Sequence, residues 1–230
     1  MAQYVISDIH GCAKTFYALL FDRLHLTHTD QLYLLGDYID RGPDSKGVLD
    51  IIQQLYDNGY QVQCLRGNHE VMLLQSYTTS NEAIWLRNGG DETLYSFGVD
   101  SVRKIPYSYI SLLLKMDYYV KTRTHYLVHA GFNFSNPNFL EDYHAMIWIR
   151  QWYDTIPYQW LQDYRIVHGH TPLPRRNIEE QLQYYRTSIL PLNIDAGCAY
   201  KGHHPELGNL CALNLDTDEL IFQENIDINE

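Results

Sequence analysis

The sequence has few basic side chains. Seventeen lysines and arginines are outnumbered by 28 aspartates and glutamates, which gives a formal net charge of −11. Because nucleic-acid binding depends on clustered basic side chains that neutralise phosphates, this balance argues against a nucleic acid as the main partner. Any phosphate site must therefore be built locally.

Cysteines are also scarce. Four cysteines are too few for a disulfide framework in a chain of 230 residues, and none belongs to a CxxC pair. Their spacing predicts reduced, buried thiols and no disulfide bond at Cys12, Cys64, Cys198 and Cys211.

Long apolar runs are missing as well. Met1 to Tyr4 lead straight into Val5 and Ile6 without a basic leader, so we expect no signal peptide and no transmembrane helix. The apolar content of 45% predicts one globular domain over residues 1–230 with one substantial core. We expect a cytoplasmic protein without a membrane partner, and the composition leaves its oligomeric state open.

The hydrophobic pattern predicts an α/β fold. Strands are expected at 3–7, 31–35 and 61–65, with helices at 14–24 and 46–58 between them, which implies parallel strands with helical crossovers.

A helix is expected at 69–75, and a helical pattern over 81–116, broken by Gly89-Gly90 and Pro106, predicts a cap insertion at about 81–120. Further strands are expected at 126–128 and 166–167, and the tail from 184 to 222 alternates as strands do. Within 134–164, Trp148 and Trp152 have helical spacing, which favours an aromatic helix face packed on the core.

Polar residues follow five separate apolar segments of this pattern. In open α/β sheets ligands bind beyond the carboxyl ends of the strands, so these residues are expected to converge on one site. Their mixture of carboxylate, imidazole and amide groups, without cysteine, suits Mn²⁺, Fe²⁺ or Zn²⁺. Six protein ligands are too many for one catalytic ion with open positions, so we expect two ions with Asp37 as the shared ligand and a bridging water as nucleophile. The candidate ligands are Asp8, His10, Asp37, Asn68, His129 and His170.

Charged residues beside these ligands predict a phosphate site. Arg41 and Arg66 could supply guanidinium forks for phosphate oxygens. Asp40 is a candidate to orient His69 as an imidazolium, since a carboxylate on one ring nitrogen favours the protonated form. His69 would then be the general acid that protonates the leaving alkoxide.

Five segments in this order resemble the calcineurin-like metallophosphoesterases: DIHG, GDYIDRG, RGNHE, HAG and VHGHTP. The pair GDxxDRG and RGNHE indicates the phosphoprotein phosphatase branch. The short chain and the segments WLRNGG (85–90), IWIR (147–150) and NIDAG (193–197) make it similar to the bacterial and phage, lambda-type, serine/threonine phosphatases. The resemblance implies a central two-sheet β-sandwich flanked by helices.

The resemblance also implies roles for individual residues. It assigns one metal ion to Asp8, His10 and Asp37, and the other to Asp37, Asn68, His129 and His170. It matches Asp40 and His69 to the acid dyad and adds Arg150 to Arg41 and Arg66 as phosphate-binding residues. The implied reaction is direct attack of a metal-bridging hydroxide on a phosphomonoester, with manganese as the preferred metal.

Several histidines fall outside this assignment. His168 precedes a matched ligand and is not expected to bind metal, and Pro172 stands where many members of the wider superfamily have a further metal-binding histidine. His203 and His204 lie in a segment, 200–210, that looks longer than its phage-type counterpart; they are expected to be solvated, with a place at the pocket rim as the alternative.

Three functions compete. The leading hypothesis is hydrolysis of phosphoserine and phosphothreonine in proteins, with small phosphoesters as surrogates. The alternative is a symmetrical diadenosine tetraphosphate hydrolase, because those enzymes share the motifs. A catalytically inactive, metal-binding scaffold is the remote third possibility, since no ligand and no acid is missing.

Overall fold

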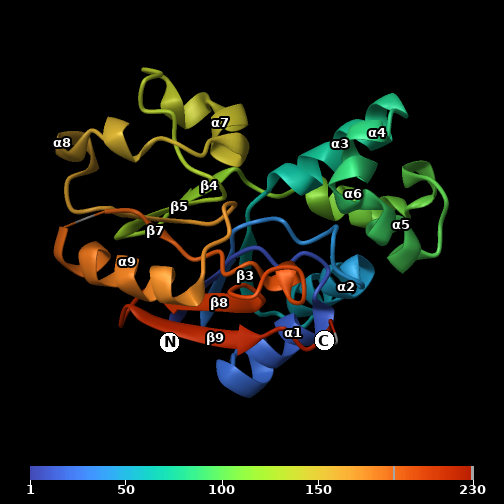
Figure 1. The fold of residues 1–230 in the computed structure, drawn as a ribbon, viewed down its shortest axis with the longest axis horizontal. Helices are drawn as coiled ribbons and strands as arrows, with labels where there is room; N and C mark the ends of the chain where they lie inside the picture. Colours follow the sequence, from blue (N-terminus) through green and yellow to red (C-terminus); the bar gives the residue numbers. More distant parts are fainter. Residues whose placement is uncertain (189, 229–230) are drawn as a thin grey trace.

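The computed structural model describes residues 1–188 and 190–228 and shows two β-sheets packed face to face, with helices on the outside (Figure 1). In the first sheet the strand order is β3-β2-β1-β8-β9. Strands β1, β2 and β3 are parallel, as the sequence predicts, while β8 and β9 are antiparallel additions at one edge. The bounds are β1 Gln3–Ile6, β2 Gln31–Leu34, β3 Gln61–Cys64, β8 Asn209–Asn214 and β9 Glu219–Glu224.

The second sheet has the strand order β4-β5-β6-β7. Strands β5, β6 and β7 are parallel, and β4 pairs with β5 in the antiparallel sense. The sequence pattern did not predict β4, which is three residues long at the sheet edge. The bounds are β4 Tyr119–Lys121, β5 His125–Val128, β6 Arg165–His168 and β7 Leu192–Asn193.

The core lies on both faces of these strands because side chains alternate along them. Val5 and Tyr33 point into the space between the sheets, where they meet Leu127 and Val167 of the second sheet. The next residues, including Ile6, point to the opposite face and pack against helices. The sheets therefore form a two-layer sandwich covered by helices, which confirms the predicted fold class.

Helices connect the parallel strands and cover the first sheet. Helix α2 begins after Asp44, whose carboxylate accepts a hydrogen bond from the amide of Gly47 at 2.8 Å and so caps the helix. It buries Val48 and Ile52 against the sheet. The bounds are α1 Ala13–Ala18, continued by the π-helical turn η1 Leu19–Arg23, α2 Ser45–Asp57 and α3 Asn68–Thr79.

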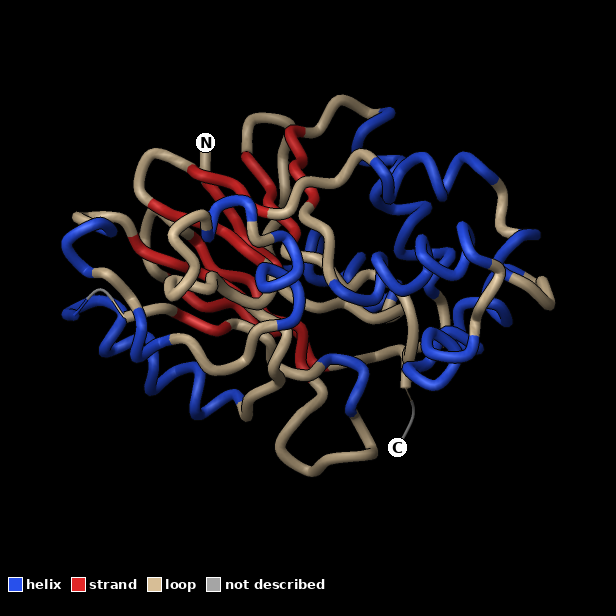
Figure 2. Tube along the Cα trace, turned by 90° about the horizontal axis from the view of Figure 1, so that it is seen from above, coloured by secondary structure: helices blue, strands red, loops and turns tan. Residues whose placement is uncertain are grey.

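A group of short helices follows α3 and lies at one end of the molecule, away from most of the strands (Figure 2). A break occurs at Gly89, whose φ is +96°, and Pro106 directly precedes the last of these helices. We call the segment 83–114 the helical insertion; that it acts as a cap stays a prediction. Its elements are α4 Ala83–Trp85, η2 Leu86–Gly90, α5 Asp91–Phe97, η3 Val102–Lys104 and α6 Tyr107–Leu114.

Two sequence predictions were wrong. The tail does not start as a strand at 184, because α9 spans Arg175–Ser188 and buries Ile178, Leu182 and Tyr185 at helical spacing. The apolar positions of this helix are so few that the alternation further along the chain obscured them. Trp148 and Trp152 do not share a helix face, because α7 (Tyr143–Trp148) ends at the first of them.

The aromatic segment nevertheless packs on the core. Trp152 is buried and its indole N–H donates to the carbonyl of Ala130 at 3.2 Å, so it fills the space under the second sheet from an irregular loop. The remaining short elements of the chain are η4 Phe139–Glu141, η5 Tyr153–Thr155, α8 Tyr158–Leu161 and η6 Cys198–Tyr200.

The four cysteines are buried and free, in agreement with the prediction of reduced thiols. Across residues 1–188 and 190–228, no helix combines the length and the apolarity that crossing a bilayer requires.

We expect Gly36→Ala to destabilise the protein strongly. Gly36 directly follows Leu35 at the exit of β2 with φ +111°, and a Cβ atom there would lie 2.5 Å from the backbone nitrogen of Gly67. Gly59 offers a matched control, because its φ is +79° but nothing lies within 4 Å of its Cβ position. The free energy of unfolding, measured by urea denaturation, should fall by about 2 to 4 kcal/mol in Gly36→Ala and by about 1 kcal/mol in Gly59→Ala. Equal losses would show that the close contact between Gly36 and the backbone of Gly67 does not limit stability.

Candidate metal centre

The turns that follow β1, β2, β5 and β6 meet at one edge of the sandwich, together with the first turn of α3. They carry all six residues predicted as metal ligands, and each of these side chains is buried. The structure therefore brings the predicted ligands together, as expected for the carboxyl ends of parallel strands.

The backbone of these turns is unusual. Five residues that are not glycine have positive φ angles between 46° and 71°, a region that side chains with a Cβ atom rarely adopt. Such angles turn the chain sharply and aim the side chains inward from the strand ends. The five residues are His10, Asp37, Asp40, Arg41 and His170.

Asp37 lies at the centre of the cluster. Its Oδ2 atom is 3.5 Å from Nε2 of His10 and 3.5 Å from Nε2 of His129. Two groups of potential ligand atoms share this carboxylate: one contains His10 and His69, and the other contains His129 and His170. Asp37 thus has the geometry expected of a bridging ligand.

In the second group, ring nitrogens of His129 and His170 lie close to each other and to the side-chain oxygen of Asn68. His129 donates from Nδ1 to the carbonyl of Leu35 at 3.1 Å, which leaves a lone pair on Nε2. This Nε2 atom lies 3.1 Å from Oδ1 of Asn68 and 3.2 Å from Nδ1 of His170. The remaining ring nitrogen of His170, Nε2, is buried without a hydrogen-bond partner. Imidazole, amide and carboxylate groups that converge in this way fit a divalent cation.

The pKa shifts of the buried side chains also favour a bound cation. Burial raises the pKa of Asp37 to about 7, and the negative charge of Asp8 adds to this rise, although His69 and Arg41 oppose it. Burial also lowers the pKa of His129 and of His10. A buried carboxylate among neutral imidazoles would keep its charge most readily with a cation beside it.

Asp8 occupies a different position from the one expected. Its carboxylate accepts hydrogen bonds from the backbone N–H of His170, at 3.1 and 3.2 Å, and from the hydroxyl of Ser7. It ties the turn after β1 to the turn after β6, and it belongs to neither of the two close groups. Its predicted role as a metal ligand stays a prediction, while the structure gives it a role in joining the turns.

His69 and Asp40, the predicted acid dyad, are in contact. Nδ1 of His69 lies 2.7 Å from Oδ2 of Asp40, and both side chains are fully buried. Burial lowers the pKa of His69, although the charge of Asp37 raises it, and Nε2 of His69 accepts a hydrogen bond from Arg41 at 2.9 Å. The dyad geometry agrees with the expectation, but this direction of the pKa does not support the expected imidazolium.

The three predicted phosphate-binding arginines differ. Arg41 reaches into the cluster, where its guanidinium donates to Nε2 of His10 at 2.7 Å as well as to His69. Arg150 lies at the edge beside the last ligand turn and donates to the hydroxyl of Thr171 at 3.2 Å. Arg66 forms hydrogen bonds with the chain after α6 and none with the cluster.

The guanidinium of Arg66 donates to the carbonyls of Leu114 and Met116, at 2.9 and 3.3 Å, and to the hydroxyl of Tyr118 at 3.2 Å. These bonds anchor the chain after α6. The structure therefore gives Arg66 an anchoring role, and its phosphate-binding role stays a prediction. The RGNHE motif alone could not reveal this, because the partners lie about 50 residues further along the chain.

Sequence reasoning missed the function of Glu70. This buried carboxylate accepts hydrogen bonds from the backbone N–H groups of Asp37, Tyr38 and Gly67 at 2.8 to 2.9 Å. It therefore holds the turn that carries the central ligand, and burial raises its pKa to about 7. Glu70 is the last letter of RGNHE, but the motif alone does not tell which backbone amides its carboxylate reaches.

The three histidines that the resemblance left out of the site, His168, His203 and His204, offer no free ligand atom to the cluster or lie at the surface. His168 donates from Nδ1 to the carbonyl of Gly169 at 3.1 Å, and its Nε2 bonds to the hydroxyl of Tyr153, so neither nitrogen faces the cluster as a free ligand. His203 and His204 are exposed in the turn after η6, as expected for solvated loop residues.

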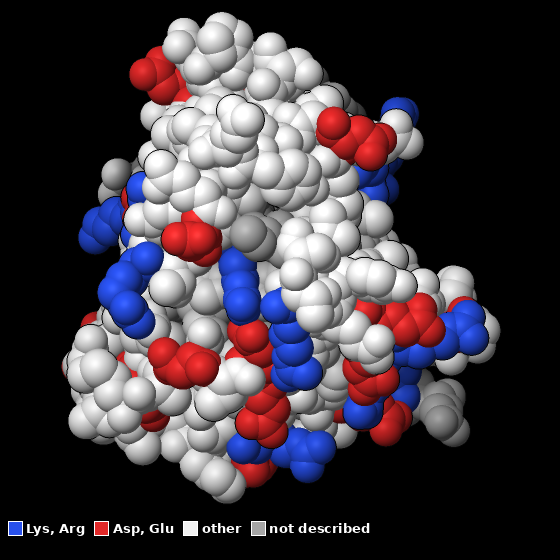
Figure 3. All heavy atoms as spheres, turned by 90° about the vertical axis from the view of Figure 1, so that its left-hand side faces the viewer, with Lys and Arg blue, Asp and Glu red and all other residues white. Residues whose placement is uncertain are grey.

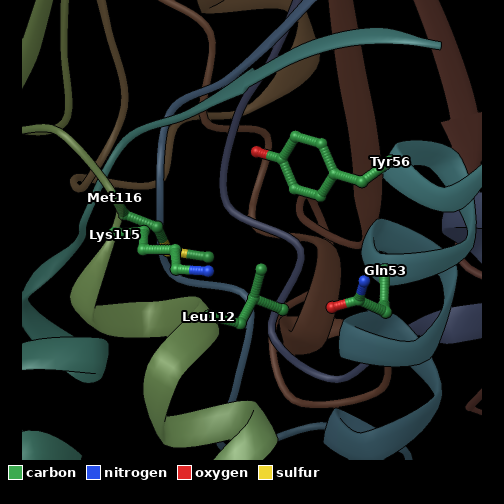
Figure 4. A pocket seen from close by; sticks show the side chains of 5 residues that line it. All are labelled: Gln53, Tyr56, Leu112, Lys115 and Met116. Carbon is green, nitrogen blue, oxygen red and sulfur yellow. The ribbon is translucent and has the colours of Figure 1, made fainter. Parts of the chain in front are cut away.

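A separate cavity of about 320 Å³ lies between α2 and the end of α6 (Figure 4). Gln53 and Tyr56 line it from α2, and Leu112, Lys115 and Met116 line it from the other side. None of these residues is a candidate ligand or phosphate-binding residue, so this cavity is not the metal centre.

Known proteins resemble this chain along most of its length. The family described as calcineurin-like phosphoesterase matches residues 1–207. Serine/threonine-protein phosphatase 1 of Salmonella typhimurium is 28% identical over 198 residues, which cover 81% of this chain and 86% of that protein. The symmetrical bis(5'-nucleosyl)-tetraphosphatase of Buchnera aphidicola is 35% identical over 131 residues, which cover 57% of this chain and 44% of that protein.

Solved structures share the fold. A candidate diadenosine tetraphosphatase superposes with a TM-score of 0.67 at 18% identity, over 98% of this chain and 94% of that one. A protein serine/threonine phosphatase from Saccharomyces cerevisiae superposes with a TM-score of 0.65 at 13% identity, over 100% of this chain and 81% of that one. Because the family match covers residues 1–207, which include all six candidate ligands and strands β1 to β7, the chain belongs to the calcineurin-like phosphoesterases, a family of hydrolases with a dinuclear metal site.

Proposed function

We propose that this protein is a metal-dependent phosphomonoesterase that removes phosphate from phosphoserine and phosphothreonine in proteins. The observation that carries the proposal is the position of Asp37, which is shared by two groups of potential metal ligands, with the His69–Asp40 pair and Arg41 directly beside it.

The donor set suggests how two cations would be held. Asp8, His10 and Asp37 would hold one ion, and the other would be held by Asp37, Asn68, His129 and His170. Manganese suits this mixture of oxygen and nitrogen ligands, with iron or zinc as alternatives. Such a pair of ions supplies positive charge that activates a water molecule and offsets the charge of the phosphate.

The residues of the chain have complementary tasks. Arg41 would bind phosphate oxygens with its two terminal nitrogens, which now donate to the imidazoles of His10 and His69. Its movement to the phosphate would free Nε2 of His69 to carry a proton to the leaving oxygen. Asp40 would keep the ring of His69 oriented through Nδ1.

The choice of substrate rests on the extent of the similarities. The match to the Salmonella phosphatase spans most of both proteins, whereas the match to the Buchnera tetraphosphatase spans less than half of that enzyme. The latter similarity has the higher identity, 35% against 28%, and keeps dinucleoside polyphosphate cleavage as the second candidate. An inactive scaffold is disfavoured because the dyad and the ligand groups are intact.

The surface also bears on partners. On the face shown in Figure 3, basic and acidic side chains alternate in the lower half and the upper part carries few charges, so the residues that the structure describes form no continuous basic stripe there. A long polyanion such as a nucleic acid would find few clustered basic side chains to neutralise its phosphates on this face. A local phosphate group presented by a protein agrees better with this distribution.

The decisive experiment compares kcat/KM on a phosphoserine peptide, a phosphothreonine peptide and diadenosine tetraphosphate, with Mn²⁺ present. We expect turnover of both phosphopeptides to exceed that of the dinucleotide by at least tenfold. Faster cleavage of the dinucleotide would replace the proposed function by the second candidate.

Arg150→Ala is expected to weaken both turnover and inhibition by inorganic phosphate. Arg150 lies beside the turn after β6 that carries His170, and its positive charge helps to lower the pKa of that imidazole. The loss should be about tenfold in kcat/KM, as for one charged contact to phosphate. The measurement is the inhibition constant for phosphate together with kcat and KM. Arg176→Ala is the control, since this arginine is exposed on α9 and pairs with Glu206 at 2.9 Å. Unchanged affinity for phosphate in Arg150→Ala would remove this residue from the site.

A further inference from the structure

The carboxylate of Asp40 is surrounded by donors that come from outside its own turn. It is fully buried, and its Oδ1 atom accepts a hydrogen bond from the hydroxyl of Thr93 at 2.7 Å. The indole N–H of Trp85 lies 2.9 Å from both carboxylate oxygens. With Nδ1 of His69 on Oδ2, donors reach both oxygens of this buried carboxylate.

Both of the outside donors belong to the helical insertion. Trp85 is the last residue of α4, and Thr93 lies in the first turn of α5. The same insertion binds the neighbouring residue through its backbone, because the carbonyl of Gly89 accepts from the amide of Arg41 at 3.2 Å. The insertion therefore contacts the turn that holds both the dyad carboxylate and the arginine of the cluster.

This arrangement gives a physical meaning to the segment WLRNGG. Its first residue supplies the donor. Gly89 adopts φ +96°, and a Cβ atom there would lie 2.8 Å from the amide nitrogen of Arg41. A Cβ atom on Gly90 would lie 2.5 Å from the ring of Trp85, so the second glycine makes room for the indole. The segment is shaped around the contact between Trp85 and the turn of Asp40.

We propose that Trp85 and Thr93 are positioning residues for the general acid, holding the carboxyl group of Asp40 aimed at Nδ1 of His69. The inference deepens the proposed function and rests on His69 as the acid of that reaction. The insertion then supports catalysis through its hydrogen bonds to Asp40.

The need for such donors follows from burial. Burial raises the pKa of Asp40 to about 8, whereas the hydrogen bonds from Thr93 and Trp85 lower it. Without them the carboxyl group would gain a proton more readily and would lose its fixed orientation. A neutral or rotated Asp40 would no longer hold the ring of His69 in place for proton transfer.

The test uses the dependence of the rate on the leaving group. An alkyl phosphate needs a proton on its leaving oxygen, and p-nitrophenyl phosphate needs it far less. Trp85→Phe keeps a buried ring but removes the N–H, and Thr93→Val removes the hydroxyl at nearly constant shape. We expect each variant to lower kcat on a phosphoserine peptide about tenfold and kcat on p-nitrophenyl phosphate less than about threefold, with the inhibition constant for phosphate unchanged.

Two controls separate positioning from general damage. Trp152→Phe also removes an indole N–H from a buried hydrogen bond, but its partner is the carbonyl of Ala130, so the ratio of the two rates should stay at the wild-type value. Thr93→Ser keeps the hydroxyl and should restore most of the loss seen in Thr93→Val. Circular dichroism and metal content are measured on every sample.

A double variant completes the experiment. If Trp85 acts through His69, Trp85→Phe should add little to the loss on phosphoserine when His69→Asn is already present. Equal losses on both substrates in Trp85→Phe and Thr93→Val, with a normal bias in His69→Asn, would overturn the inference and leave the proposed function standing. Equal losses in His69→Asn itself would overturn the inference and the acid role of His69, because no acid would remain to be positioned, while the proposed substrate class is tested separately by the comparison of phosphopeptides with the dinucleotide.

Discussion

Removal of divalent cations is expected to abolish phosphatase activity, and Mn²⁺ is expected to restore it. The reason is the donor set: Nε2 of His129 faces an amide oxygen and another imidazole nitrogen, and all the candidate ligands are oxygen or nitrogen groups. Without a cation these residues can bind a phosphate only through arginines and cannot activate water. The measurement is the rate on a phosphopeptide before chelation, after it, and after addition of each divalent metal.

Binding itself provides an independent measurement. Mn²⁺ should raise the melting temperature of wild-type protein, because an ion that binds only the folded chain stabilises it. Asp37→Asn should abolish most of this rise, since the shared carboxylate is lost. A chelator already saturated with Mn²⁺ controls for effects of the chelator on the assay. Full activity in a sample verified to be free of metal would disprove the dinuclear mechanism.

His69→Asn is expected to slow hydrolysis of phosphoserine by about 10² or more while affecting p-nitrophenyl phosphate distinctly less. The imidazole is fully buried against Asp40 and next to Arg41, so it is placed to give a proton to the leaving oxygen. A nitrophenolate leaves well without such help. The measurement is kcat on both substrates.

Metal content decides how the His69 result is interpreted. His69 lies within 4.8 Å of His10 and Asp37 at their potential ligand atoms, so the variant must be shown to keep both ions. Asp40→Asn should show the same bias more weakly, because it only orients the ring. A loss of metal in His69→Asn, or equal losses on the two substrates, would mean that His69 is not the acid.

The sequence was most informative where topology places residues automatically. Parallel strands joined by helices bring their carboxyl ends to one edge, so polar residues at Asp37, His129 and His170 could be assigned to one site without knowledge of side-chain positions. The two-sheet sandwich required the resemblance, since periodicity does not tell which strands belong to which sheet. The register of β1 against β8, about 200 residues apart, has no local signal.

The sequence was least informative about residues whose partners are distant. Arg66 binds carbonyls of the chain after α6, and Trp85 binds a carboxylate 45 residues earlier; neither contact follows from local pattern. Glu70 lies in the expected helix 69–75, and this position gives no sign that its carboxylate reaches three backbone amides. Helix α9 was missed because few of its residues are apolar.

The left-handed turns around the metal centre set stability against function. Asp37, Asp40, Arg41, His10 and His170 adopt positive φ angles that glycine would accept without cost, and each such position costs the fold about 1 kcal/mol or more. Four of these side chains are buried, so glycine there would leave cavities and unpaired groups. A directed-evolution experiment that selects only for heat resistance should therefore introduce glycine at Arg41, the one of the five that is not buried, and lose hydrolysis as it does so. The same experiment with a requirement for activity should keep Arg41 and collect its gains elsewhere.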